Sequence, residues 1–255
     1  MYLSRLILNP QSIQVRRDIA NCVQLHRTIL SAFPQADKKK EMKARESFGI
    51  LYRLDWYRRT GTYIVLVQSK EHPDWSSLPK NYLLNINSGI QNPETKNIEH
   101  FMNSIEAGLI YRFRLRANPT RKISTISKKD LLAGAVKSNG MRVPIRDDKL
   151  LMEWMNRKAN DGGFTLISMK TVPNLPDVLI SPSETQKCPR NIGKQNLGEE
   201  PDNTRRKGTA LTFETVIFEG KLQVSDKAKF TETLQKGVGS GKGYGFGLLS
   251  IAPIP

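Results

Sequence analysis

His26 is the side chain in this sequence best suited to move a proton at neutral pH. The sequence contains three histidines, His26, His72 and His100, and free imidazole titrates near neutrality. His26 lies between Val23 and Leu30, in a stretch whose apolar residues recur at helical spacing. A histidine on such a stripe is more often a core residue than a catalytic one, so both interpretations stay open. We expect the other two histidines to be structural or incidental.

A glycine-rich stretch is the second candidate for chemistry. Six glycines occupy alternate positions from 237 to 247, with Lys242 and Tyr244 among them. Glycine backbone can approach a phosphate closely, and Lys242 adds a cation. The stretch fits neither the P-loop spacing nor the GxGxxG spacing, so we expect no nucleotide cofactor. The alternative interpretation is a flexible turn before an edge strand.

The charge of the chain indicates a polyanionic partner. It contains 40 Lys and Arg residues against 24 Asp and Glu residues, a formal net charge of +16. Basic side chains near phosphates release condensed counterions, so this balance favours nucleic acid. The excess is concentrated between residues 112 and 158, where 13 basic and 4 acidic residues give +9, and a second basic run covers residues 38–45. The alternative for each run is a solvated face.

No metal-binding motif is recognisable in the sequence. It has no HExxH and no Cys/His cluster, and the acidic pairs at 147–148 and 199–200 indicate helix capping and surface charge. An RNA strand can supply its own nucleophile, the 2′-hydroxyl. A metal-free enzyme then needs a proton-transfer group and a cation at the phosphate. His26 and Lys242 provide both if the fold brings them together, so we expect no metal and no cofactor.

The elements that must position these residues follow one order in each half of the chain. Predicted strands lie at residues 2–8, 48–56, 62–68, 97–104, 109–117, 164–171, 211–222 and 247–252, and helices at 12–33, 146–159 and 226–236. Each half approximates the order strand, helix, strand, strand, helix, strand of the ferredoxin-like unit. We therefore predict an α+β protein of two tandem ferredoxin-like (RRM-like) domains, residues 1–104 and 105–255. The polar segment 181–208 is expected to be a mobile loop.

Cysteine usage and hydropathy indicate the compartment. Cys22 and Cys188 form neither a CxxC motif nor a disulfide framework, so we expect a reducing environment. No apolar run approaches the 18 residues that a membrane span needs, and the first residues lack a secretion signal. We expect a cytoplasmic protein that makes no membrane contact.

Six short motifs are spread over both ends and the middle of the chain. They are residues 1–4, residues 24–26 with the histidine, residues 113–119, residues 142–144, residues 218–220 and the glycine-rich segment 237–253. In this order they resemble the CasE family, the CRISPR endoribonucleases of type I-E systems. The resemblance implies two ferredoxin-like domains that bind the CRISPR repeat hairpin. It also implies cleavage of precursor crRNA at the 3′ base of the hairpin, a 2′,3′-cyclic phosphate product, and retention of the enzyme in the Cascade complex.

The resemblance also implies roles for individual residues. His26 would transfer the proton, and the RNA backbone would lie near Lys242, Gly241, Gly243, Tyr244 and Gly245. Many members of the family have a tyrosine three residues before the histidine, whereas this sequence has Val23. Because valine cannot transfer a proton, either cleavage is slower here or Tyr244 or Lys242 takes over the role.

Basic residues of the second half are expected to dominate hairpin binding. An RNA stem hides its bases in a deep groove and is recognised through backbone contacts and shape. Our candidates are Arg114, Arg116, Arg142, Arg157 and Lys158. The first two alternate along one strand and should share a face, for which the alternative interpretation is a solvated sheet face.

Two other functions remain open. Val23 supports a non-catalytic hairpin-binding subunit of the same complex. A general RNA-recognition module would need exposed aromatic residues for base stacking, but aromatic residues make up only 7% of the chain. Such a module should prefer unstructured RNA, whereas a repeat-processing enzyme should prefer the hairpin.

Overall fold

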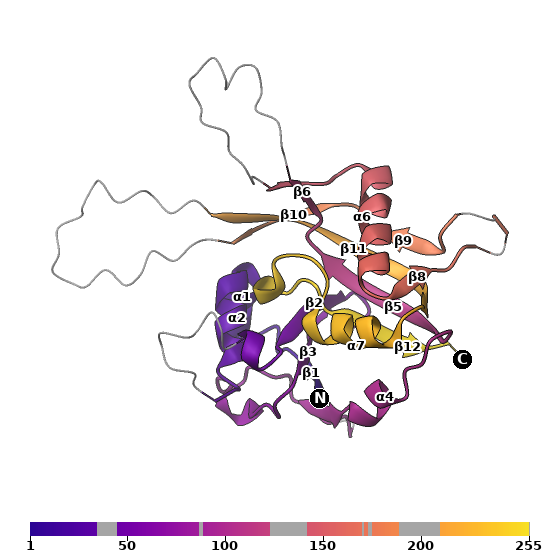
Figure 1. Ribbon diagram of the computed structural model, residues 1–255. Coiled ribbons are helices and arrows are strands. Elements are labelled where there is room, and N and C mark those ends of the chain that lie inside the picture. Colours follow the sequence, from indigo (N-terminus) through magenta and orange to yellow (C-terminus); the bar gives the residue numbers. More distant parts are fainter. Residues whose placement is uncertain are drawn as a thin grey trace, which may run out of the picture.

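Two antiparallel sheets, one from each half of the chain, form the centre of the molecule. The computed structural model describes residues 1–34, 45–86, 89–122, 142–169, 171–172, 175–188 and 210–254. Each sheet has its own cluster of buried apolar side chains. In Figure 1 the glycine-rich segment, in yellow, lies against the indigo helices of the N-terminal half. Segments far apart in the sequence, α2 and the glycine-rich segment, therefore lie side by side.

The first sheet has the spatial order β2-β3-β1-β4. Its strands are β1 (Tyr2–Ile7), β2 (Leu51–Tyr57), β3 (Thr62–Ser69) and β4 (Glu94–Asn97). Helices α1 (Ile13–Ala20) and α2 (Cys22–Leu30) pack on it through Val15, Leu25 and Ile29. In place of a second long helix this unit has the short 3-10 turn η2 (Trp75–Ser77).

The helix predicted over residues 12–33 is divided in two at Asn21. The Asn21 backbone is extended, and its side-chain oxygen accepts a hydrogen bond from the Val23 amide at 3.0 Å. Ser12 caps the first helix in the same way through the Val15 amide. Asn21 is thus a second N-cap in the middle of the apolar stripe. A new helix starts there, because the Asn21 side chain accepts from a backbone amide that a continuous helix would pair with a carbonyl of the preceding turn. His26 belongs to this new helix, α2.

The second sheet has the order β10-β11-β5-β12, with β8 and β9 also pairing with β11. Its strands are β5 (Ile110–Ala117), β8 (Phe164–Leu166), β9 (Val178–Ile180), β10 (Glu184–Cys188), β11 (Leu211–Val224) and β12 (Leu249–Pro253). Two helices contribute to its core, α6 (Asp148–Asp161) and α7 (Lys227–Lys236). Asp147 caps α6 by accepting from the Leu150 amide at 3.0 Å, as the acidic pair at its start suggested. A separate small ribbon is formed by β6 (Thr120–Lys122) and β7 (Arg142–Pro144).

The strand order confirms the predicted fold class. In each sheet the first strand lies between the last two strands of that sheet, β1 between β3 and β4 and β5 between β11 and β12, and these pairings are antiparallel. This is the arrangement of the ferredoxin-like unit, here α+β and in tandem. None of the described helices is long and apolar enough to cross a membrane.

Three local predictions differ from the structure. Residues 97–104 are largely helical, because β4 ends at Asn97 and α4 (Glu99–Asn103) follows, with Met102 in the second core rather than the first. The domain boundary at residue 104 stays a prediction. The strand predicted at 164–171 ends at Leu166. The segment 181–208, expected to be a mobile loop, contains β10 at its start, and its residues 189–208 lie outside the described residues.

The expectation that both cysteines are reduced was wrong for this structure. Cys22 and Cys188 are disulfide-bonded, with an S–S distance of 2.03 Å and a Cα–Cα distance of 5.8 Å. The two positions are 166 residues apart in sequence, so no local spacing motif announces their pairing. The bond joins the start of α2 to the end of β10 and thereby ties the two halves together.

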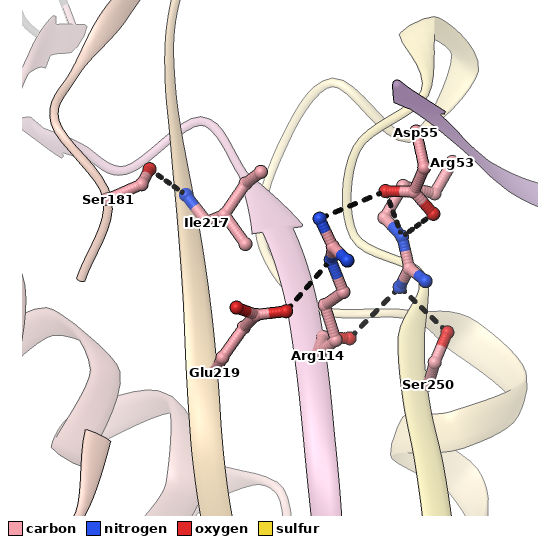
Figure 2. A network of polar contacts seen from close by, with 7 residues as sticks. All are labelled: Arg53, Asp55, Arg114, Ser181, Ile217, Glu219 and Ser250. Carbon is pink, nitrogen blue, oxygen red and sulfur yellow. Dashed lines mark hydrogen bonds and ion pairs between the residues drawn. The ribbon is translucent and has the colours of Figure 1, made fainter. Parts of the chain in front are cut away.

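A polar network also joins the two halves (Figure 2). The buried Arg53 side chain on β2 pairs with Asp55 at 2.8 Å and donates to Ser250 Oγ at 2.8 Å and to the Arg114 carbonyl at 3.2 Å. Arg114 in turn pairs with Asp55 at 3.5 Å and with Glu219 at 3.1 Å. Since β2 belongs to the first sheet and β5, β11 and β12 to the second, this network fixes the two sheets relative to one another.

Candidate active site

His26 is held in its neutral form at the junction of the two halves. It lies on α2, and its ring stacks on that of Tyr52 from β2, with centroids 6.1 Å apart and planes 19° apart. Burial, followed by the positive charges of Arg45 and Arg27, lowers the pKa of His26 from 6.5 to about 4. Its Nδ1 atom is buried without a hydrogen-bond partner among the described residues. At neutral pH this imidazole can therefore accept a proton.

The glycine-rich segment presents a one-turn helix, η3 (Lys242–Tyr244), to this histidine. Gly241 and Gly245 flank the turn with φ angles of 76° and 85°, in the left-handed region that glycine adopts without steric cost. The Tyr52 hydroxyl donates to the Gly243 carbonyl at 3.1 Å. The Tyr244 ring lies 6.5 Å from the His26 ring. Tyr52 therefore contacts both His26 and the turn that carries Lys242.

Gly243 keeps a small space open between the side chains of Arg45 and His26. A Cβ atom at this position would lie 3.7 Å from Arg45 Cδ and 3.7 Å from both Cε1 and Nε2 of His26. Burial, with Arg45 the largest electrostatic contribution, lowers the pKa of the half-buried Lys242. The fold thus brings His26 and the Lys242 turn together, which is the condition that the sequence left open.

A basic cavity of about 780 Å³ adjoins the turn through Lys242. It lies between α6, the β6–β7 ribbon and the first part of the glycine-rich segment. Its basic lining residues are Arg121, Lys122, Arg142, Arg157, Lys158 and Lys242. Asp161 is the acid in the lining, and Lys158 pairs with it at 3.4 Å. Such an excess of positive charge in a concave surface favours a phosphate backbone.

Two of the expected RNA-binding arginines have other surroundings. Arg114 belongs to the network of Figure 2, in ion pairs with Asp55 and Glu219. Arg116 lies over the Phe246 ring, 5.1 Å from its centroid, and donates to Gln186 at 3.1 Å. Neither lines the basic cavity, whereas Arg142, Arg157 and Lys158 do. The structure therefore groups three of the five expected residues with Lys242.

The sequence did not single out Arg45, Tyr52, Arg121 or Lys122. Arg45 was one member of a basic run, and Tyr52 resembled an ordinary core residue of a strand. Its hydroxyl reaches a partner 191 residues away, a distance that no local pattern reveals. Of the other two histidines, His72 packs edge-on against the Tyr2 ring and His100 is exposed. In the described part of the chain no group of three His, Cys, Asp or Glu side chains is placed to hold a metal ion.

Known proteins resemble this chain in sequence and in structure. The CRISPR-associated endoribonuclease Cse3 of Thermus thermophilus is 32% identical over 256 residues, which are 99% of this chain and 100% of that protein. The Cascade subunit CasE of Escherichia coli K12 is 27% identical over 161 residues, 63% of this chain and 65% of that protein. Thermus thermophilus Cse3 bound to an RNA representing a pre-cleavage complex superimposes with a TM-score of 0.70 at 30% identity, covering 99% of this chain and 98% of that one.

The family profile gives the same result. The profile described as CRISPR associated protein matches residues 1–253, which include both sheets, His26 and the glycine-rich segment. This chain therefore belongs to the CRISPR associated protein family, as its motifs indicated.

Proposed function

We propose that this protein is an endoribonuclease that binds the CRISPR repeat hairpin and cleaves precursor crRNA at the 3′ base of the hairpin. One observation carries the proposal: a neutral histidine contacts a lysine-bearing turn at the edge of a cavity with six basic side chains. The relatives support it, since one is named an endoribonuclease and the other a Cascade subunit.

In the proposed reaction the RNA supplies the nucleophile and no metal takes part. The neutral His26 imidazole accepts the proton of the 2′-hydroxyl, whose oxygen attacks the adjacent phosphorus. The bond from phosphorus to the 5′-oxygen breaks, leaving a 2′,3′-cyclic phosphate and a 5′-hydroxyl. Lys242 lies at the phosphate and, with a pKa lowered by burial, is a better proton donor to the leaving oxygen than an ordinary lysine.

The hairpin stem would lie in the basic cavity. Arg142, Arg157 and Lys158 contact its backbone from β7 and α6. The turn Gly241–Gly245 lies at the end of the stem, where the strand enters the space beside His26. Arg114 and Arg116 do not line this cavity, so we propose that they support RNA binding either by stabilising the interface between the sheets or by contacting RNA outside the cavity.

The protein is also proposed to stay on its product and to join the other Cascade subunits in the cytoplasm. Many basic contacts to one backbone favour slow release, because each bound phosphate adds to the affinity at physiological salt. The relative named as a Cascade subunit supports this assembly.

A second candidate is a non-catalytic hairpin-binding subunit of the same complex. Val23 favours it, since the position one helical turn before His26 carries no group that transfers protons. The Tyr244 ring beside His26 favours the enzyme, because this side chain can take the place of the missing tyrosine.

Cleavage of the host's CRISPR repeat RNA in EDTA tests the proposal. We expect single-turnover cutting by the wild type, loss of cutting with retained binding in His26→Ala, and wild-type cutting in the control His100→Ala, which removes an exposed histidine. Tight hairpin binding without cutting by the wild type would instead support the non-catalytic subunit. In that case Val23→Tyr should restore cleavage.

A further inference from the structure

We propose that Arg45 touches the scissile phosphate and stabilises the charge that develops on it, an inference that rests on the proposed function. Arg45 belongs to a short helical segment that precedes β2. Its side chain is only 17% exposed, so the packing of the chain holds its arm in place. No sequence motif marks this residue, and none of the expected site residues lies within fifteen positions of it.

The geometry places Arg45 across from His26. The arm of Arg45 and the Nε2 edge of His26 are equally far, 3.7 Å, from the point where a Gly243 side chain would begin. The same small space is therefore bounded by the imidazole, by the arginine arm and by the turn that carries Lys242. A phosphate next to a 2′-hydroxyl that contacts His26 would lie within reach of the guanidinium.

The charges around this space are unbalanced. Arg45 pairs with Glu46 at 3.2 Å, but the Glu46 side chain is 71% exposed, and such surface pairs contribute little. Arg53 offers the contrast: its side chain is also largely buried, and a buried carboxylate, Asp55, neutralises it at 2.8 Å. The positive charge of Arg45 thus acts on both of its neighbours, because it lowers the pKa of His26 and the pKa of Lys242. A bound phosphate would offset that charge.

The chemistry assigns Arg45 a role that His26 and Lys242 do not fill. As the 2′-oxygen bonds to phosphorus and the bond to the 5′-oxygen breaks, negative charge grows on the two non-bridging oxygens. A guanidinium can donate two parallel hydrogen bonds to such oxygens and retains its proton at any physiological pH. His26 takes the proton from the 2′-hydroxyl and Lys242 gives one to the leaving oxygen, while Arg45 stabilises the transition state without exchanging a proton.

A binding cycle tests the contact independently of cleavage. The ligand is the host's repeat RNA with a 2′-deoxynucleotide at the cleavage position, which prevents cutting, and with either a phosphate or a neutral methylphosphonate at the next linkage. We expect the methylphosphonate to weaken binding to the wild type about tenfold, and to have no further effect on Arg45→Ala. Arg58→Ala, which removes an exposed arginine from the β2–β3 turn, should behave as the wild type does.

Single-turnover cleavage of the all-ribose RNA tests the catalytic role. Arg45→Ala should cut about 100-fold more slowly, and Arg45→Lys should recover part of the rate. Arg45→Gln, which keeps most of the packed arm, is the second variant if the alanine protein does not fold. Equal sensitivity of wild type and Arg45→Ala to the methylphosphonate, or an unchanged cleavage rate, would overturn the proposal. If the wild type itself does not cut, the proposed function and the catalytic role of Arg45 both fail. The binding measurements with the phosphate and methylphosphonate RNAs still show whether Arg45 contacts this phosphate.

Discussion

Replacing Asp55 with alanine leaves the Arg53 guanidinium between the two sheets without its carboxylate. The two side chains are only 6% and 9% exposed, so water cannot take the place of the lost partner. Removing one member of a buried ion pair costs about 3–5 kcal/mol. Arg114 also loses its contact with Asp55, which places the expected loss of unfolding free energy at about 4 kcal/mol.

The size of the chain converts this loss into a measurable shift. Unfolding entropy is about 2.1 cal/mol/K per residue, so for 255 residues a loss of 4 kcal/mol lowers Tm by about 7 °C. Urea denaturation followed by tryptophan fluorescence gives the free energy directly. Cleavage should slow as well, because β2 also carries Tyr52, which holds the Gly243 turn against His26.

Two further variants decide whether the reasoning is right. The double substitution Arg53→Met with Asp55→Leu removes both charges, and it should recover at least about 2 kcal/mol of the loss. Glu94→Ala breaks the more exposed Arg5–Glu94 pair of the first sheet and should cost less than about 1 kcal/mol. The reasoning is refuted if Asp55→Ala costs no more than Glu94→Ala, or if the double variant is less stable than the single one.

Three other perturbations follow from the structure. Because the pKa of His26 falls from 6.5 to about 4 on folding, the unfolded chain binds a proton between these values that the folded protein does not. The free energy of unfolding should therefore drop by up to about 3 kcal/mol as the pH falls from 7 to 4. This drop should be smaller in His26→Ala. Because His26 stays neutral, the kcat/KM for cleavage should not change between pH 6 and 8. Replacing both Cys22 and Cys188 with serine opens a link between positions 166 residues apart and should cost about 2–5 kcal/mol; wild type in reductant should then match the double variant in urea denaturation. Gly245→Ala places a Cβ atom on a backbone with φ 85° and 3.1 Å from the Tyr52 ring. It should lower the free energy of unfolding by about 1–2 kcal/mol and slow cleavage. The control Gly61→Ala, whose Cβ would meet no atom within 4 Å, should leave cleavage unchanged.

The sequence predicted the elements whose signal is local. The alternation of Tyr111, Phe113 and Leu115 with arginines identified β5, and the same apolar and polar residues occupy the inner and outer positions in the structure. The polar segment near Cys188 was misassigned, because β10 is a short edge strand whose residues become ordered by pairing with β11 rather than by their own pattern.

The candidate site depends on contacts that no local pattern contains. His26 and Lys242 were found by their chemistry, but Tyr52 and Arg45 acquire their places only when β2 lies beneath the glycine-rich turn. Arg114 was expected at the RNA for its charge and its place on one strand face, but its carboxylate neighbours come from strands distant in sequence. Spacing within one segment predicts which side chains share a face, whereas the partner across an interface is set by the packing of the two sheets.

The meeting of His26 with the turn Lys242–Tyr244 has a consequence for synthesis on the ribosome. The N-terminal sheet leaves the ribosome early, yet the segment that completes the site and the strand β12 that closes the second sheet are made more than 200 residues after the histidine. A growing chain can therefore fold its first sheet and expose His26 without having the lysine opposite it. On the proposed function, cutting ability would appear only after the glycine-rich segment has been made, so synthesis interrupted before that segment should release fragments that cannot cleave RNA.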